Sequence, residues 1–189
     1  SIELKTGFAA NGVAGSIVVE VGQSGTGQGA PLRVAAGSSS TVTGGAVLIA
    51  SGSSESSTSG EVTLSTSNAG TAGSSGAMNI QTGNTVSGSS GEFILSSGAS
   101  TGGSSGNIEM NVGNSIQGIG GNIDIISGSS TQALGGSVTL SAGASDGNTG
   151  GDIIFTAGQG LAETGGSITM RSGGSAERAS GSIAFASAN

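Results

Sequence analysis

The sequence has no cysteine, histidine, tryptophan or tyrosine, and its 189 residues include one proline and four phenylalanines. Without histidine or cysteine, the usual zinc sites and a Ser-His-Asp triad are excluded. The stretch from Gly98 to Gly102 matches the G-x-S-x-G pattern of serine hydrolases, but no histidine is present to activate Ser100. We therefore predict a protein that is not an enzyme, with no catalytic residue and no cofactor.

Positive charge is also scarce. Four lysine and arginine residues stand against eleven acidic ones, which gives a formal net charge of −7. A surface of this kind disfavours nucleic acid and anionic membranes as partners. No apolar run approaches the length of a transmembrane span. The sequence thus predicts no nucleic-acid partner and no membrane insertion.

Glycine and serine dominate what is present, with 40 glycines and 37 serines. Chains of this composition commonly stay disordered, because they bury too little apolar surface to offset the entropy of ordering the backbone. A stable fold would require the few large apolar residues to be regularly placed.

The apolar residues follow a repeat of 15 residues that begins at Ser1, with one repeat of 16 residues between Glu61 and Gly76. Positions 2 and 4 of each repeat are always apolar, as in Val47 and Ile49 or Ile183 and Phe185. Positions 7 and 15 are glycine except at Ser67 and Ala30. Position 9 is always a small residue. Alternation of this kind is typical of short strands, and the glycines indicate recurrent turns.

This repeat predicts an all-β fold, a single β-solenoid of about 12 to 13 coils over residues 1–189. Each coil would contain two short segments joined at glycine corners. A thin core would place Ile, Val and Leu of one segment against Ser, Ala and Gly of the other, with coils about 4.8 Å apart. Because the chain starts at repeat position 1 and stops within a repeat at Asn189, we expect a segment of a longer array.

Two alternatives remain open. A disordered Gly/Ser tract leaves the apolar periodicity unexplained. An antiparallel meander would reverse the direction of successive strands, whereas near-identical repeats favour equivalent environments. A collagen-like bundle is excluded, because glycine does not recur at every third residue.

The charged residues offer one candidate metal site. In stacked coils Lys5 would lie beside Glu20, and Glu163 beside Arg178, which are favourable cross-strand pairs. Glu109 and Asp124 would instead place two carboxylates side by side at position 3. This pair is a weak candidate for binding a cation, and a solvated acidic face is the simpler interpretation.

The rhythm SSG-x-Φ-x-Φ-x-[ST]-G (Φ, apolar) is clearest in GSSGEFILSSGASTGGSSGNIEM, residues 88–110. It resembles Gly/Ser-rich short-repeat proteins of cell surfaces and extracellular matrices in microalgae and other protists, and more loosely bacterial surface solenoids. The resemblance covers the whole chain and implies an extracellular or cell-surface location and a structural or adhesive role. It implies no site residue.

We therefore expect a structural repeat module of an extracellular fibre, coat or adhesin stalk that associates with itself or with further repeats. Contact would involve the uncapped ends or a flat sheet face on which position 3 places Val18, Leu48, Ile94 and Ile154. The alternative is a module that binds ice or polysaccharide through its flat Ser/Thr/Gly face. The regular Thr-x-Thr rows of insect and grass antifreeze solenoids are missing at position 3.

Overall fold

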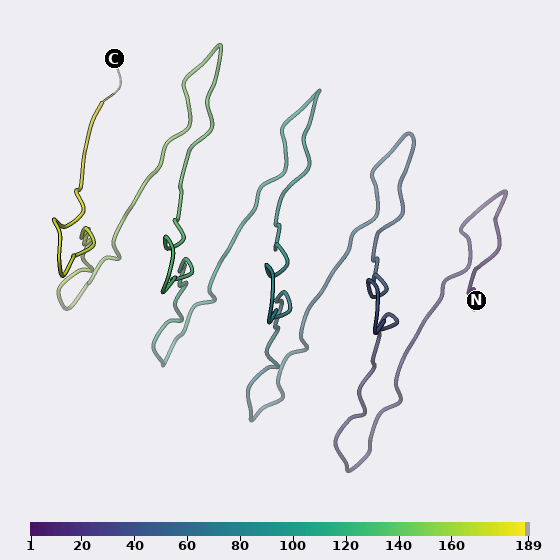
Figure 1. Cartoon of the computed structure of the whole chain (residues 1–189). Helices are drawn as coiled ribbons and strands as arrows, with labels where there is room; N and C mark the ends of the chain where they lie inside the picture. The colour runs from purple at the N-terminus through teal and green to yellow at the C-terminus, as the bar shows by residue number, and fades with distance from the viewer. Residues whose placement is uncertain (188–189) are drawn as a thin grey trace. The chain divides into compact units, whose positions relative to one another are not determined.

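The structure is a computed structural model and describes residues 1–187. Over this range it contains no helix and no β-strand, only extended stretches that alternate with bends and compact loops (Figure 1). The prediction of an all-β solenoid is therefore wrong. The extended stretches have the alternation of a strand, but they lack the backbone ladder that would join them into a sheet.

The 15-residue period is nevertheless present in the backbone. Each full repeat bends at positions 10–12, one residue later in the repeat of 16 residues. The bends occupy residues 10–12, 25–27, 40–42, 55–57, 71–73, 86–88, 101–103, 116–118, 131–133, 146–148, 161–163 and 176–178. The repeat thus sets where the chain turns, although it does not stack the turns into a sheet.

Half of the full repeats close their loop with one backbone hydrogen bond. The amide of position 15 donates to the carbonyl of position 7 over 2.8 to 2.9 Å. We call these the closed loops: 37–45, 52–60, 128–136, 143–151, 158–166 and 173–181. A closed loop brings the two glycines of a repeat together, so they form the neck of the loop rather than two separate corners.

Serine at position 9 fixes the bend inside most loops. Its Oγ accepts a hydrogen bond from the amide three residues later, at 2.9 to 3.1 Å, which is the usual local bonding of a serine turn. The serines that do this are Ser39, Ser54, Ser100, Ser115, Ser130, Ser145 and Ser175. Position 9 was expected to face a core, and the structure places it in a turn instead.

Three loops turn by a different device. Gly12, Gly73 and Gly88 adopt φ angles of 100°, 119° and 99°, in a region that side chains rarely enter. Three residues before each of them stands Ala9, Gly70 or Thr85 rather than serine. In these three loops, which lack the serine acceptor, a glycine of positive φ closes the bend instead.

The extra residue of the long repeat is absorbed by its loop. A Cβ on Gly76 would lie 3.8 Å from the Cβ of Thr66, and one on Gly91 the same distance from Thr82, so the neck keeps its geometry. The bend at 71–73 comes one position later in its repeat than the other bends, so the added residue lies between the start of the repeat and the bend. From the bend to Gly76 and the next extended stretch, the spacing is the same as in the other repeats.

The predicted core does not form. No residue among 1–187 is buried, and every one except Ala9 and Ala157 exposes more than a third of its surface. The chain exposes 18842 Å². A folded protein of its 17.5 kDa would expose about 7,900 Å² and its unfolded chain about 25,000 Å². Local bonds rather than apolar burial therefore shape the single chain.

Contacts group the chain into two units, Ser1–Ile94 and Leu95–Asn189. The division falls inside one extended stretch, and the repeat runs through it without interruption. That the repeat forms one continuous domain over 1–189 stays a prediction.

Candidate functional site

The second unit contains a pocket between one loop neck and a later extended stretch. Its volume is about 930 Å³. Its lining includes Ser97 and Gly106 from a neck, the following residues Asn107, Ile108 and Glu109, and Ser141 and Gly143 from further along the chain.

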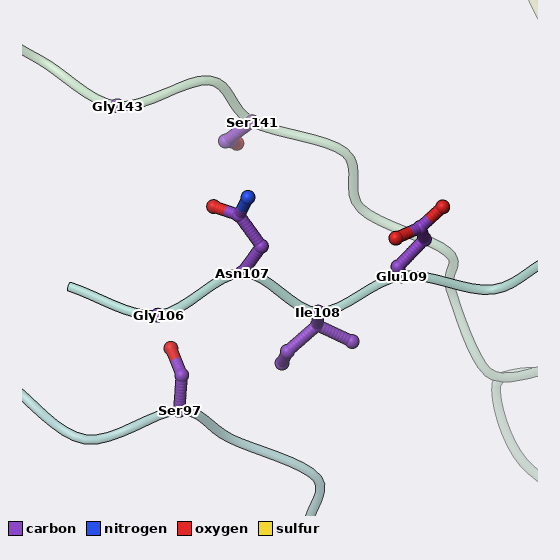
Figure 2. A pocket seen from close by; sticks show the side chains of 7 residues that line it. All are labelled: Ser97, Gly106, Asn107, Ile108, Glu109, Ser141 and Gly143. Carbon is purple, nitrogen blue, oxygen red and sulfur yellow. The ribbon is translucent and has the colours of Figure 1, made fainter.

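Local alternation sorts the side chains around this pocket. Asn107 and Glu109 project from one side of the backbone and Ile108 from the other (Figure 2). Ser141 is directed toward Asn107, and the Ser97 side chain toward Gly106. Extended backbone produces this separation, because successive side chains point to opposite faces. The sequence predicted the alternation correctly within this stretch.

The groups that line the pocket can form hydrogen bonds. They supply one carboxylate, one amide and two hydroxyls, and within residues 1–187 neither serine hydroxyl is hydrogen-bonded to the Glu109 carboxylate. The Glu109 carboxylate accepts a hydrogen bond from the Asn111 side-chain amide. All seven lining residues are exposed, so water competes for each polar contact.

Only one of the two carboxylates of the candidate cation pair lines this pocket. Glu109 lines it, whereas Asp124 does not. Within residues 1–187, no group of three or more acidic residues is placed to hold a metal ion. The pairing of Glu109 with Asp124 on one cation stays a prediction without a structural site to carry it.

Lys5 forms a different ion pair from the expected one. Its Nζ lies 2.6 Å from Glu3 Oε1, within the same repeat. Both side chains are about 70% exposed, so this pair contributes little stability. In the part of the chain that the structure describes, neither Lys5 with Glu20 nor Glu163 with Arg178 forms an ion pair. The stacking that would have created those pairs is absent.

Sequence reasoning missed the closed loops and the serine turns. The signal was present: position 9 is serine in most repeats, and glycine recurs at positions 7 and 15. Both interactions are local. The serine Oγ accepts a hydrogen bond from the amide three residues later, and glycine lets the two backbone segments at the neck approach each other closely. The repeat predicts position 9 for the second layer of a core and the glycines of positions 7 and 15 for two separate corners, and neither expectation includes a loop that is closed at its neck.

Comparisons with known proteins find no relative. No family model, curated protein or solved structure matches this chain. The described residues also contain no helix that is long and apolar enough to cross a membrane.

Proposed function

We propose that this chain is a non-enzymatic structural repeat module of an extracellular fibre, coat or adhesin stalk, and that it associates with further chains of its own kind. The supporting observation is the exposure of its periodic apolar residues. From the second repeat onward, position 2 exposes 49 to 59% of its surface, as at Ile17, Ile123 and Ile153. Position 4 exposes 51 to 83%, as at Ile125, Phe155 and Phe185.

Such residues favour contact with other chains. Full burial of one Val, Ile, Leu or Phe side chain contributes about 1.5 to 3 kcal/mol, and these side chains are about half covered already. Each repeat therefore offers about 2 kcal/mol from its two positions. Association costs about 4 to 15 kcal/mol in lost freedom, so several repeats must make contact together. A partner with the same 15-residue spacing meets this condition.

Charge opposes association only weakly. The net charge is −7, but charged residues make up 8% of the chain and are scattered along it. Charges separated by more than about 8 Å are largely screened at physiological salt. Apolar contact over several repeats therefore outweighs the repulsion between copies.

Sedimentation velocity over a concentration series tests this proposal. We expect mass to rise with concentration at neutral pH. Replacing Ile123, Ile125 and Val138 together with serine should weaken association, because it removes periodic side chains from two adjacent repeats.

The matched control replaces Ile116, Ile119 and Leu134 with serine. These loop residues are 96 to 99% exposed and do not follow the alternating positions, so their loss should change association less. A chain that stays monomeric at high concentration contradicts the proposal. It would favour the alternative of a monomeric module for ice or polysaccharide, which thermal-hysteresis and glycan-binding assays test directly.

A further inference from the structure

The residues of the closed loops add almost nothing to the end-to-end distance of the chain. In each of them nine residues leave and return to the same point, with the amide of position 15 lying 2.8 to 2.9 Å from the carbonyl of position 7. The stretches between loops run extended rather than folded back on themselves (Figure 1), so they hold less length to release. Under tension, the loops are therefore the parts of this chain that can yield.

We propose that the closed loops act as a reversible reserve of length, which tension releases and which returns when the tension falls. Opening one loop separates positions 7 and 15 by eight residue steps, or about 26 to 29 Å when extended. Each opening thus adds about 25 Å, and the six closed loops together add about 150 Å.

Reversibility follows from the local character of the closing contacts. A closed loop is held by one backbone hydrogen bond, in most cases by a serine turn, and by van der Waals contact at the neck. No buried core has to be rebuilt after opening, because none of the described residues is buried. Loops of about ten residues close within about 10 to 100 ns, far faster than mechanical loading of a fibre.

Glycine at the neck eases closure in some of the loops. A Cβ built on Gly45 would lie 3.3 Å from both the Ala36 Cβ and the Gly37 nitrogen. On Gly136 it would lie 3.3 Å from the Gly128 carbonyl oxygen. Contacts this short would require the neck to widen by a few tenths of an ångström, whereas a Cβ on Gly151 or Gly181 would make ordinary contacts of 3.5 and 3.7 Å. Glycine at position 15 therefore favours a tight neck most strongly at Gly45 and Gly136.

This inference rests on the proposed structural role, since a reserve of length is useful only in a chain that bears tension. It is nevertheless a property of the single molecule. Association is measured in solution at rising concentration, whereas the reserve is measured on one tethered chain. Each can therefore fail without the other.

The test is force-extension measurement on the full chain held by both ends in an optical trap. The first variant combines Gly45→Pro, Gly136→Pro and Gly151→Pro, which removes the donor of three closing bonds. The control combines Gly76→Pro, Gly91→Pro and Gly106→Pro at the same repeat position. Among the described residues, these three amides form no closing bond. Both variants therefore add the same three proline rings.

We expect the first variant to be longer than the unmodified chain at low force, by up to about 75 Å for its three open loops. Both chains should reach similar lengths at high force, and the unmodified chain should retrace its curve on relaxation. The control should follow the unmodified chain. Coincidence of the first variant with the unmodified chain at low force, or an equal lengthening of the control, overturns the proposal.

Discussion

The backbone amide of Ala133 donates a hydrogen bond to the Oγ of Ser130 at 2.9 Å. This bond lies inside a loop whose ends are joined by the Gly136 amide and the Gly128 carbonyl, at 2.8 Å. The serine therefore fixes the bend, and the glycines fix the neck. Both interactions are local, and both recur along the chain with the sequence repeat.

Replacing Ser130 with alanine should loosen this bend. The Ala133 amide would lose its acceptor, at a cost of about 1 kcal/mol, or roughly a fivefold change in the population of the turn. Amide hydrogen exchange at Ala133, measured by NMR, should accelerate by about that factor. The control is Ser129→Ala, since the Ser129 hydroxyl forms no hydrogen bond within the described residues. Equal exchange rates in the two variants would contradict a serine-held turn.

Replacing Gly88 with alanine should strain the bend of its loop. Gly88 has φ of 99° with no atom near its missing Cβ, so the cost is conformational rather than steric. We expect about 1 to 2 kcal/mol against the observed turn. Gly83→Ala provides the comparison, because that site has equal space and no positive φ. NMR chemical shifts across residues 84–90 should change for Gly88→Ala and stay nearly unchanged for Gly83→Ala.

Replacing Gly160 with serine should disrupt its loop, even though serine is the commonest residue at position 9. A Cβ there would collide with the carbonyl oxygens of Glu163 and Thr164. The closing bond from Gly166 to Gly158 should therefore be lost, and exchange at the Gly166 amide should accelerate. Gly147→Ser is the control, because nothing lies within 4 Å of its Cβ position. Retention of protection at Gly166 would show that the loop adapts.

The dilute chain should melt without a cooperative transition. Cooperative unfolding requires a shared apolar core, and none of the described residues is buried. Differential scanning calorimetry at low concentration should therefore show no heat-absorption peak, and far-UV circular dichroism should show no helix. A sharp peak that does not depend on concentration would indicate a core that this structure lacks.

Local features were predictable from the sequence, and long-range ones were not. Alternation around Ile108 and the spacing of the bends follow from residue order, because a side chain's face and a turn's place depend on nearby residues. Stacking of one repeat on the next depends on whether Ile123 and Ile125 find a partner surface within the same chain. Periodicity alone does not reveal this, since it favours contact inside one chain and contact between chains equally.

At the candidate site, too, the local features were predictable from the sequence and the long-range contact was not. Glu109 is the only residue of the predicted acidic pair at the pocket, because the position of Asp124 beside it depended on stacked repeats. The closed loops were missed although their residues were visible, since serine and glycine suit both a thin core and a tight turn. The choice between those roles depends on backbone geometry, which composition does not contain.

The serine turn makes the backbone conformation of a loop independent of the side chains at its tip. The Oγ of Ser39 accepts a hydrogen bond from the Val42 amide, and the side chains of the two residues between them take no part in this bond. Ser145 and the Asn148 amide enclose a different pair in the same way. The tips accordingly read Ser-Thr-Val at 40–42 and Asp-Gly-Asn at 146–148 on equivalent turns. Substitutions in these triplets would change the surface that neighbouring molecules meet, while the serine-held turns kept their form.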